Sequence, residues 1–185
     1  MSLLEAATAQ LERIVTSIPL DQWDKPTPCD LVIHEVVDHV VAGNVFAVRL
    51  LAGASTAAAT AGLDGDQLGA DPLSAVSTSC ASQAAAFAAV DANRALHHPI
   101  GEISVETFIR FRLGELVVHA WDLAVGAGID ATLDPALVEG LWVLVAPHLD
   151  EMRRMGSFGN GASNNLPPDA STQTRLLDAF GRRTS

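Results

Sequence analysis

The sequence is poor in several residue types, and each shortage excludes a class of protein. The 185 residues include two cysteines and no tyrosine, and 11 Lys and Arg stand against 22 Asp and Glu. Two cysteines, Cys29 and Cys80, are too few for a disulfide framework. No stretch of about 20 apolar residues is free of charges, so we expect no transmembrane helix.

Basic residues are also scarce at the start of the chain and over its whole length. Residues 1–5 (MSLLE) lack the positive start and apolar core of a signal peptide, so we expect a cytoplasmic protein. The formal net charge of −11 disfavours binding to nucleic acid or to anionic membranes, because both need patches of Lys and Arg.

Several common catalytic and binding motifs are also absent from the sequence. Gly-rich phosphate loops, G-x-S-x-G, H-E-x-x-H and paired C-x-x-C motifs do not occur.

The sequence is rich in Ala, Val and Leu, and this composition favours a mainly helical globular fold. Apolar residues at helical spacing predict helices over 2–19, 31–51, 72–94, 105–126, 135–155 and 171–180. We expect loops over 52–70 and 156–168 and a turn at 97–102. The prediction is an all-α domain covering residues 1–185, with four long helices forming a bundle.

The helix expected over 105–126 contains the most informative motif. Between residues 113 and 125 only Glu115, His119 and Asp122 are polar. At 100° per residue, His119 lies about 40° from Glu115 on the helix circumference, and Asp122 lies about 20° away on the other side. One narrow polar stripe on an otherwise apolar helix predicts a metal site, with a plain solvated stripe as the alternative.

Glu115 and His119 can bind one ion from a single helix because the i, i+4 spacing stacks them. The best candidate for a third ligand is His39, which we expect on the apolar face of the helix over 31–51, with Asn44 pointing away from that face. Two imidazoles and one carboxylate leave coordination positions open, which is typical of catalytic sites.

Neighbouring residues have both functional and structural interpretations. Asp122 either hydrogen-bonds a ligand imidazole or lies exposed near the helix end. Arg112 either binds the carboxylate of a substrate or cofactor or pairs with Glu115. Cys29 is interpreted as a buried apolar residue, because no Lys, Arg or His lies close to it in sequence. His97 and His98, on an exposed turn, are left out of the site.

Four segments together resemble a known family. Residues 23–29 (WDKPTPC), 36–44 (VVDHVVAGN), 115–124 (ELVVHAWDLA) and 176–182 (LLDAFGR) resemble actinobacterial metal-binding proteins of the DinB/YfiT-like superfamily. The pattern is most similar to the N-terminal domain of mycothiol-dependent maleylpyruvate isomerase. The resemblance implies a DinB-like four-helix bundle that binds a divalent metal, zinc or else nickel, through His39, Glu115 and His119. It also implies a low-molecular-weight thiol such as mycothiol as co-substrate.

From these motifs we expect a thiol-dependent metalloenzyme that acts on a small electrophile. S-transfer is favoured over isomerisation, because the 185 residues do not include the extra C-terminal domain of the isomerase. The alternatives are a non-catalytic protein that binds metal or a small ligand, and a bundle that has lost its metal and serves to form a homodimer. No catalytic residue beyond the three metal ligands follows from the sequence.

Overall fold

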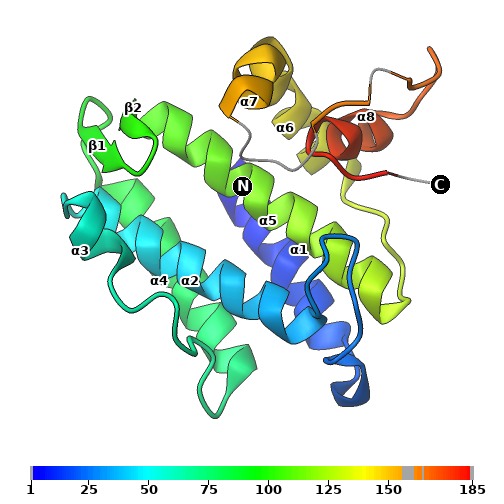
Figure 1. The fold of residues 1–185 in the computed structure, drawn as a ribbon, viewed down its shortest axis with the longest axis horizontal. Helices are drawn as coiled ribbons and strands as arrows, with labels where there is room; N and C mark the ends of the chain where they lie inside the picture. The colour runs from blue at the N-terminus through cyan, green and yellow to red at the C-terminus, as the bar shows by residue number, and fades with distance from the viewer. Residues whose placement is uncertain (1, 156–160, 164, 184–185) are drawn as a thin grey trace.

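Four long helices form the body of the protein in the computed structural model, which describes residues 2–155, 161–163 and 165–183 (Figure 1). The long helices are α1 (Leu3–Ser17), α2 (Ile33–Leu51), α4 (Pro72–Ala89) and α5 (Val105–Ala127). The shorter elements are η1 (Leu20–Gln22), α3 (Thr56–Thr60), β1 (Ala95–His98), β2 (Gly101–Ser104), α6 (Pro135–Val145), η2 (Ala146–His148), α7 (Leu149–Met155) and α8 (Thr172–Ala179). The all-α bundle predicted from the sequence is confirmed.

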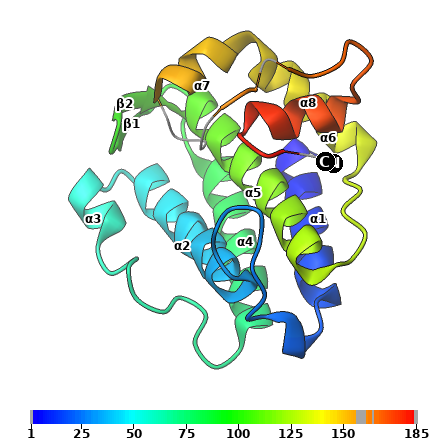
Figure 2. The same cartoon turned by 45° about the vertical axis from the view of Figure 1, so that its right-hand side comes forward.

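The long helices pack in a ring, in which each contacts two others. Around the ring, α1 contacts α5, α5 contacts α2, α2 contacts α4 and α4 contacts α1. The hairpin and α3 lie together at one end of α2, whereas α6 and α8 cover α1 and α5 at the other side (Figure 2). As a result α2 and α5, which carry the predicted ligands, are direct neighbours.

The helices begin where the capping residues predict. Asp71 and Asp134 accept hydrogen bonds from backbone N–H groups three residues later, and each is followed by proline at the first helical position. The Ser104 hydroxyl caps α5 in the same way, and α5 ends at Gly128, whose φ of 67° suits a residue without a side chain. Local side-chain chemistry therefore determines most helix boundaries.

Three expected segments differ from the sequence prediction. α4 ends at Ala89, because Asp91 forms a turn by accepting the N–H of Asn93. The expected turn at 97–102 is the centre of a β-hairpin that pairs Ala95–His98 with Gly101–Ser104. The helix expected over 135–155 is interrupted, because Pro147 has no N–H to donate and the chain passes through η2 before α7.

The two expected loops, 52–70 and 156–168, agree only in part with the structure. Residues 52–70 include the short helix α3, which begins at a capping serine, Ser55. Much of the loop predicted for 156–168 lies outside the described residues, and its described part contains no helix or strand. No described helix combines the length and hydrophobicity needed to cross a lipid bilayer.

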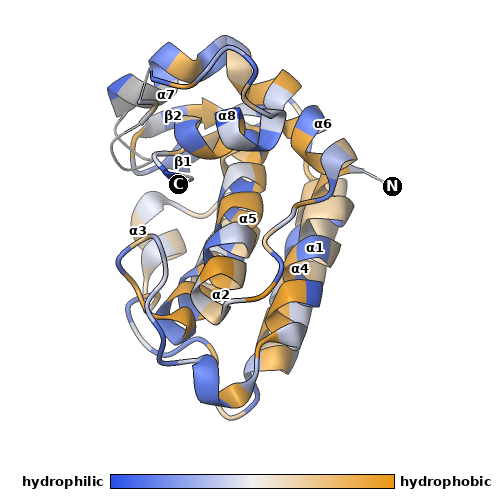
Figure 3. Cartoon of the chain, turned by 90° about the vertical axis from the view of Figure 1, so that its right-hand side faces the viewer, coloured by the Kyte–Doolittle hydropathy of each residue, from blue (hydrophilic) through white to orange (hydrophobic). Residues whose placement is uncertain are grey.

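The buried side chains are mostly apolar and come mainly from the helices, along which Figure 3 shows apolar and polar residues alternating. The main core joins α1, α2, α5 and α6, and a smaller apolar cluster lies beneath the hairpin, around Leu50, Leu96 and Phe108. Burial of this apolar surface is the main source of stability. The end of the bundle near the hairpin thus has its own core, which supports the wall of a cavity described below.

Candidate metal centre and the cavity beside it

Helix α5 places Glu115 and His119 one turn apart on the same face. The helix is buried over almost its full circumference between Leu113 and Ala124. Glu115 Oε2 lies 3.3 Å from His119 Nε2, and His119 is 8% exposed. The i, i+4 spacing therefore brings a carboxylate and an imidazole together on a largely buried helix.

His39 reaches the same carboxylate from α2. Its Nε2 lies 3.0 Å from Glu115 Oε2, and its ring centroid lies 5.2 Å from that of His119. The His39 side chain is 51% exposed, so it does not point into the core as the sequence predicted. The buried stripe of α2 is centred on Val37, Val40 and Asn44, which leaves His39 at its border, open to solvent.

The three side chains form a donor set suited to a divalent cation. One ligand atom from each of His39, Glu115 and His119 lies within 4.8 Å of the other two. Two imidazole nitrogens and a carboxylate oxygen are common zinc ligands, and an open side is typical of catalytic zinc sites. The residues present therefore fit the cation that the resemblance implies.

A second carboxylate holds the His119 ring from behind. Asp122 is fully buried, and its Oδ2 lies 3.0 Å from His119 Nδ1. Arg182, just after α8, donates to both oxygens of Asp122, with Nη2 2.6 Å from Oδ2. A carboxylate in this position orients an imidazole and defines which ring nitrogen faces a metal.

The sequence reasoning did not include Arg182 in the site. Arg182 lies 60 residues after Asp122, and no helical spacing connects them. It does belong to the segment 176–182 that carries the family resemblance, which is the one signal that could have pointed to it.

These contacts shift the ionisation of all three groups. Burial opposes the charged form of His119, but hydrogen bonds with Asp122, Cys29 and Glu115 outweigh it and raise the pKa of His119 well above its ordinary value. Burial likewise opposes charge on Glu115, yet its hydrogen bonds with the two histidines hold its pKa well below the ordinary value. The pKa of Asp122 is lowered against burial by His119 and Arg182.

Cys29 also lies at this site, where it is partly exposed and contacts His119, which corrects its interpretation as a buried apolar residue. Burial would raise the pKa of the thiol, but hydrogen bonds with His119 and Thr27 lower it overall. The loop that carries Cys29 is held by the Thr27 hydroxyl, which donates to Leu31 O, and by Asp30 with a φ of 64°. The proximity arises between a loop and a helix that are 90 residues apart, so sequence neighbours could not reveal it.

Cys29, His119 and Asp122 form a second group whose ligand atoms lie within 4.8 Å of one another. Both oxygens of Asp122 already accept hydrogen bonds from the Arg182 guanidinium. A cation placed there would meet this positive charge, so the group of His39, Glu115 and His119 is the better cation site.

A cavity of about 380 Å³ opens directly beside the donor set. His39 and Glu115 form one end of its lining, and the other walls come from α2, α5, the segment around α3 and the hairpin. Most of the lining is apolar, including Phe46, Phe108 and Phe111. This size and composition are typical of sites for small molecules.

Arg112 is the charged residue of the cavity wall beyond the donor set. Its Nε donates to Gln83 Oε1 at 2.8 Å and its Nη2 to Asn44 Oδ1 at 2.9 Å. Arg112 does not form the ion pair with Glu115 that the sequence offered as its structural role. Asn44 is fully buried and so does not lie away from the buried face of α2, as the sequence suggested. Burial lowers the pKa of Arg112, partly opposed by the charge of Glu115.

Gly43 allows the Arg112 guanidinium to lie against α2. A Cβ at Gly43 would come within 2.4 Å of Arg112 Nη1. The close approach explains how a guanidinium fits between the two helices while remaining part of the cavity wall.

The histidine pair of the hairpin separates into two environments. His97 is exposed, whereas His98 is half-buried and lines the cavity. His98 was excluded from the site because the sequence predicted an exposed turn. The alternation of faces along a β-strand, which would have separated His97 from His98, was not recognised in that segment.

The chain is similar to a known protein family over most of the bundle. A family model described as the mycothiol maleylpyruvate isomerase N-terminal domain matches residues 4–124. This range includes His39, Arg112, Glu115, His119 and Asp122. No solved structure matches the chain significantly.

Two uncharacterized proteins, from two strains of Mycobacterium tuberculosis, are each 32% identical to the chain over 127 residues. The matched region is 67% of this chain, and the chain spans about 65% of the length of these relatives.

Proposed function

The chain belongs to the mycothiol maleylpyruvate isomerase N-terminal domain family, in the DinB/YfiT-like superfamily, and from this premise we propose that it is a thiol-dependent metalloenzyme. The proposed metal ligands are His39, Glu115 and His119. The proposed reaction is transfer of the sulfur of a mycothiol-type thiol to a small electrophile, or thiol-assisted isomerisation of that electrophile.

One observation carries the proposal: the three donors converge beside a mainly apolar cavity, whose lining includes His39 and Glu115. A purely structural metal site has a closed set of protein ligands, whereas catalytic sites keep positions for water or substrate. The half-exposed His39 ring leaves such an open side. The cavity beside it offers room for the electrophile, which favours an enzyme over a protein that only stores metal.

The chemistry of the donor set favours zinc, with nickel as the alternative, since imidazole and carboxylate suit both ions. Either cation, when bound, would lower the pKa of a thiol at its open position and so supply a nucleophile near neutral pH.

The other residues act on the ligands and the substrates. Asp122, held by Arg182, orients His119 so that Nε2 faces the cation. The Arg112 guanidinium, which has no carboxylate partner among the described residues, is proposed to bind an anionic group of the thiol or the electrophile. The phenylalanine walls exclude water from the reacting atoms.

Elemental analysis of the purified protein tests the metal. We expect about one zinc or nickel ion per chain, little or none in His39→Ala and His119→Ala, and an unchanged content in His97→Ala, because His97 is an exposed histidine outside the donor set. Testing the half-exposed His39 alongside His119 guards against misfolding of the buried variant. A wild-type protein without stoichiometric metal would contradict the proposal.

Turnover is tested with the metal-loaded protein, mycothiol and a panel of small electrophiles. Consumption of both reactants that disappears in His39→Ala would support the enzyme. Bound metal without turnover of any electrophile would instead support the non-catalytic binding protein. A protein with neither metal nor turnover would point to a bundle whose site serves another role, and sedimentation would then test for a homodimer.

A further inference from the structure

The β-hairpin supplies a wall of the cavity that none of the sequence motifs includes. From β1, His98 contributes its ring to the lining. The ring centroid of His98 lies 5.6 Å from Phe46, 5.9 Å from Phe108 and 5.8 Å from Phe111. One imidazole thus lies among three phenylalanine rings that belong to α2 and α5.

The hairpin holds this imidazole in a defined place. Leu96 on β1 is buried in the small core beneath the hairpin, and the Thr56 hydroxyl donates to the backbone oxygen of His97 at 2.6 Å. β1 and β2 pair over four residues each. These contacts attach the hairpin to both α3 and the bundle, so the position of His98 does not depend on a free loop.

The hydrogen bonding of the ring determines which nitrogen can meet a ligand. The N–H of Ile100 donates to His98 Nδ1 at 3.3 Å, so a neutral ring carries its proton on Nε2. Burial lowers the pKa of His98, which favours this neutral form. Among the described residues Nε2 has no hydrogen-bond partner, and it is not one of the buried unpartnered atoms. A residue that lines the mainly apolar cavity therefore has an N–H donor available to a ligand.

We propose that His98 determines substrate specificity, by donating its Nε2–H to an acceptor oxygen on an aromatic electrophile whose ring packs against Phe46 and Phe111. This inference rests on the proposed function, because it assigns the substrate class of the same cavity. The ligand has one aromatic ring and a nitro or carbonyl oxygen.

The walls favour an aromatic ligand over an aliphatic one. Phenylalanine rings prefer to contact other rings edge-to-face or with an offset, with centroids about 4.5–7 Å apart. Phe46 already contacts His98 and Phe108 edge-to-face, and Phe111 contacts His98 in the same way. A cavity of about 380 Å³ accommodates a single substituted ring beside the donor set.

The acceptor oxygen of the ligand determines which ligands the cavity prefers. A donor in an apolar wall loses water when the ligand enters, so a ligand without an acceptor leaves the N–H unpaired. A ligand with an acceptor oxygen restores the hydrogen bond. His98 therefore discriminates between ligands of the same shape, which the phenylalanine rings cannot do.

Binding measured without thiol separates this inference from the proposed function. The metal-loaded full-length protein is titrated with meta-dinitrobenzene and with meta-xylene, which has methyl groups in place of the nitro groups, and ligand-detected NMR gives both dissociation constants. For His98→Phe we expect the dissociation constant of meta-dinitrobenzene to rise about 10-fold, and that of meta-xylene to stay within about twofold.

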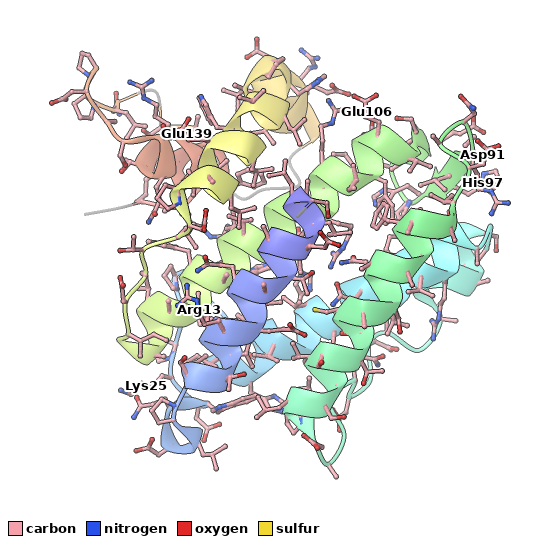
Figure 4. The ribbon with its side chains drawn as sticks, turned by 180° about the vertical axis from the view of Figure 1, so that it is seen from behind. Arg13, Lys25, Asp91, His97, Glu106 and Glu139 are labelled. Atoms are coloured by element: carbon pink, nitrogen blue, oxygen red, sulfur yellow. The ribbon has the colours of Figure 1, made fainter. Side chains whose placement is uncertain are left out.

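Two further variants serve as controls. His98→Gln retains an amide N–H near the position of Nε2, and we expect it to restore most of the lost affinity for meta-dinitrobenzene. His97→Ala changes the exposed neighbour, which Figure 4 shows at the outer edge of the molecule, and should change the dissociation constant of neither ligand.

Equal weakening of both ligands in His98→Phe would overturn the inference, because it would mean that the ring only shapes the wall. The absence of any loss for meta-dinitrobenzene, or no binding of either ligand to the wild type, would overturn it as well. Selective binding without thiol turnover would contradict the proposed function and leave the role of His98 supported.

Discussion

The two nitrogens of the His119 ring each face a different carboxylate. Glu115 Oε2 lies 3.3 Å from Nε2, and Asp122 Oδ2 lies 3.0 Å from Nδ1. Without metal this arrangement favours the doubly protonated ring, which can donate to both sides. A cation at Nε2 must displace one of these protons, whereas the Asp122 side remains intact. The same contacts thus hold the His119 ring in the metal-free protein and orient it for binding a cation.

This arrangement predicts how the stability of the metal-free protein depends on pH. The pKa of His119 is raised above 6.5, so its contribution is complete below about pH 6.5 and is lost as the pH rises through the folded-state pKa. Those of Asp122 and Glu115 are lowered, so their contribution is lost only as the pH falls below about 4. We expect chelator-treated protein to be most stable near pH 5–6 in urea titrations.

His119→Phe supplies the control for the alkaline limb. It removes the titrating ring, so the decrease in stability above about pH 6.5 should be smaller than in the wild type. With excess zinc the trend should reverse in the wild type, because binding to the neutral ring releases a proton. If stability falls equally steeply with pH in the wild type and in His119→Phe, groups other than His119 dominate the alkaline limb.

The two cysteines are expected to differ in reactivity. Cys29 is partly exposed and its pKa is lowered by hydrogen bonds with His119 and Thr27 that outweigh burial, whereas burial raises the pKa of Cys80 to about 11. In native metal-free protein at pH 7.5, iodoacetamide should modify Cys29 at least about 10-fold faster than Cys80, as mapped by mass spectrometry. Comparable rates for both, or faster reaction at Cys80, would contradict the burial described here.

At the scale of elements, α5 is the helix that connects the bundle to the predicted site. It contacts α1, α2 and α6, and it carries two of the three proposed metal ligands together with much of the cavity wall. Its glycine at position 114 allows Phe180 to pack directly on the helix backbone: an added Cβ would lie 2.5 Å from the ring. The segment after α8, including Arg182, is thereby brought to Asp122.

Gly114→Ala is therefore expected to destabilise the protein by about 1–2 kcal/mol, because overpacking against a buried ring outweighs the gain in helix propensity. The matched control is Gly140→Ala in α6, where the Cβ would meet only the end of the flexible Leu3 side chain. The control should be neutral or slightly stabilising. Chemical unfolding measures both, and a neutral Gly114→Ala would mean that Phe180 can move aside easily.

At the scale of the whole molecule, the proposed metal joins the two neighbouring helices α2 and α5. A ligand that binds only the folded state at about 100 times its dissociation constant adds about 2.7 kcal/mol. For a chain of this length this corresponds to a rise in Tm of roughly 5–11 °C. We expect calorimetry to show this rise on adding zinc to chelated wild-type protein.

The same zinc addition should leave the Tm of His39→Ala and His119→Ala almost unchanged, since each lacks one of the three donors. His97→Ala should respond like the wild type. A full response in both ligand variants would mean that zinc binds elsewhere on the chain.

Much of the architecture followed from local sequence signals. The capping residues Asp71, Ser104 and Asp134 marked helix starts correctly, because their side chains satisfy backbone N–H groups a few residues away. The position of Glu115, His119 and Asp122 on one face of α5 also followed from periodicity alone. Signals of this kind act within a few residues of the chain.

Other features depended on contacts between distant segments. The approach of Cys29 to His119, the binding of Arg182 to Asp122 and the place of Asn44 beneath Arg112 join residues from different elements. The sequence placed His39 on the buried face of α2 and Asn44 away from it. The structure buries Asn44 and leaves His39 at the border of that face, because the orientation of a helix about its own axis is decided by its neighbours. The hairpin was missed because its strands are only four residues long.

The sequence by itself determined the all-α bundle, the starts of α4 and α5 and the polar stripe on α5, because helical periodicity and capping are local properties. Only the tertiary structure decided that His39 meets Glu115 at an open side, that Arg182 supports Asp122 and that His98 faces a cavity. These relations arise when helices, loop and hairpin pack around a common core, and no spacing along the chain encodes the rotation at which they meet.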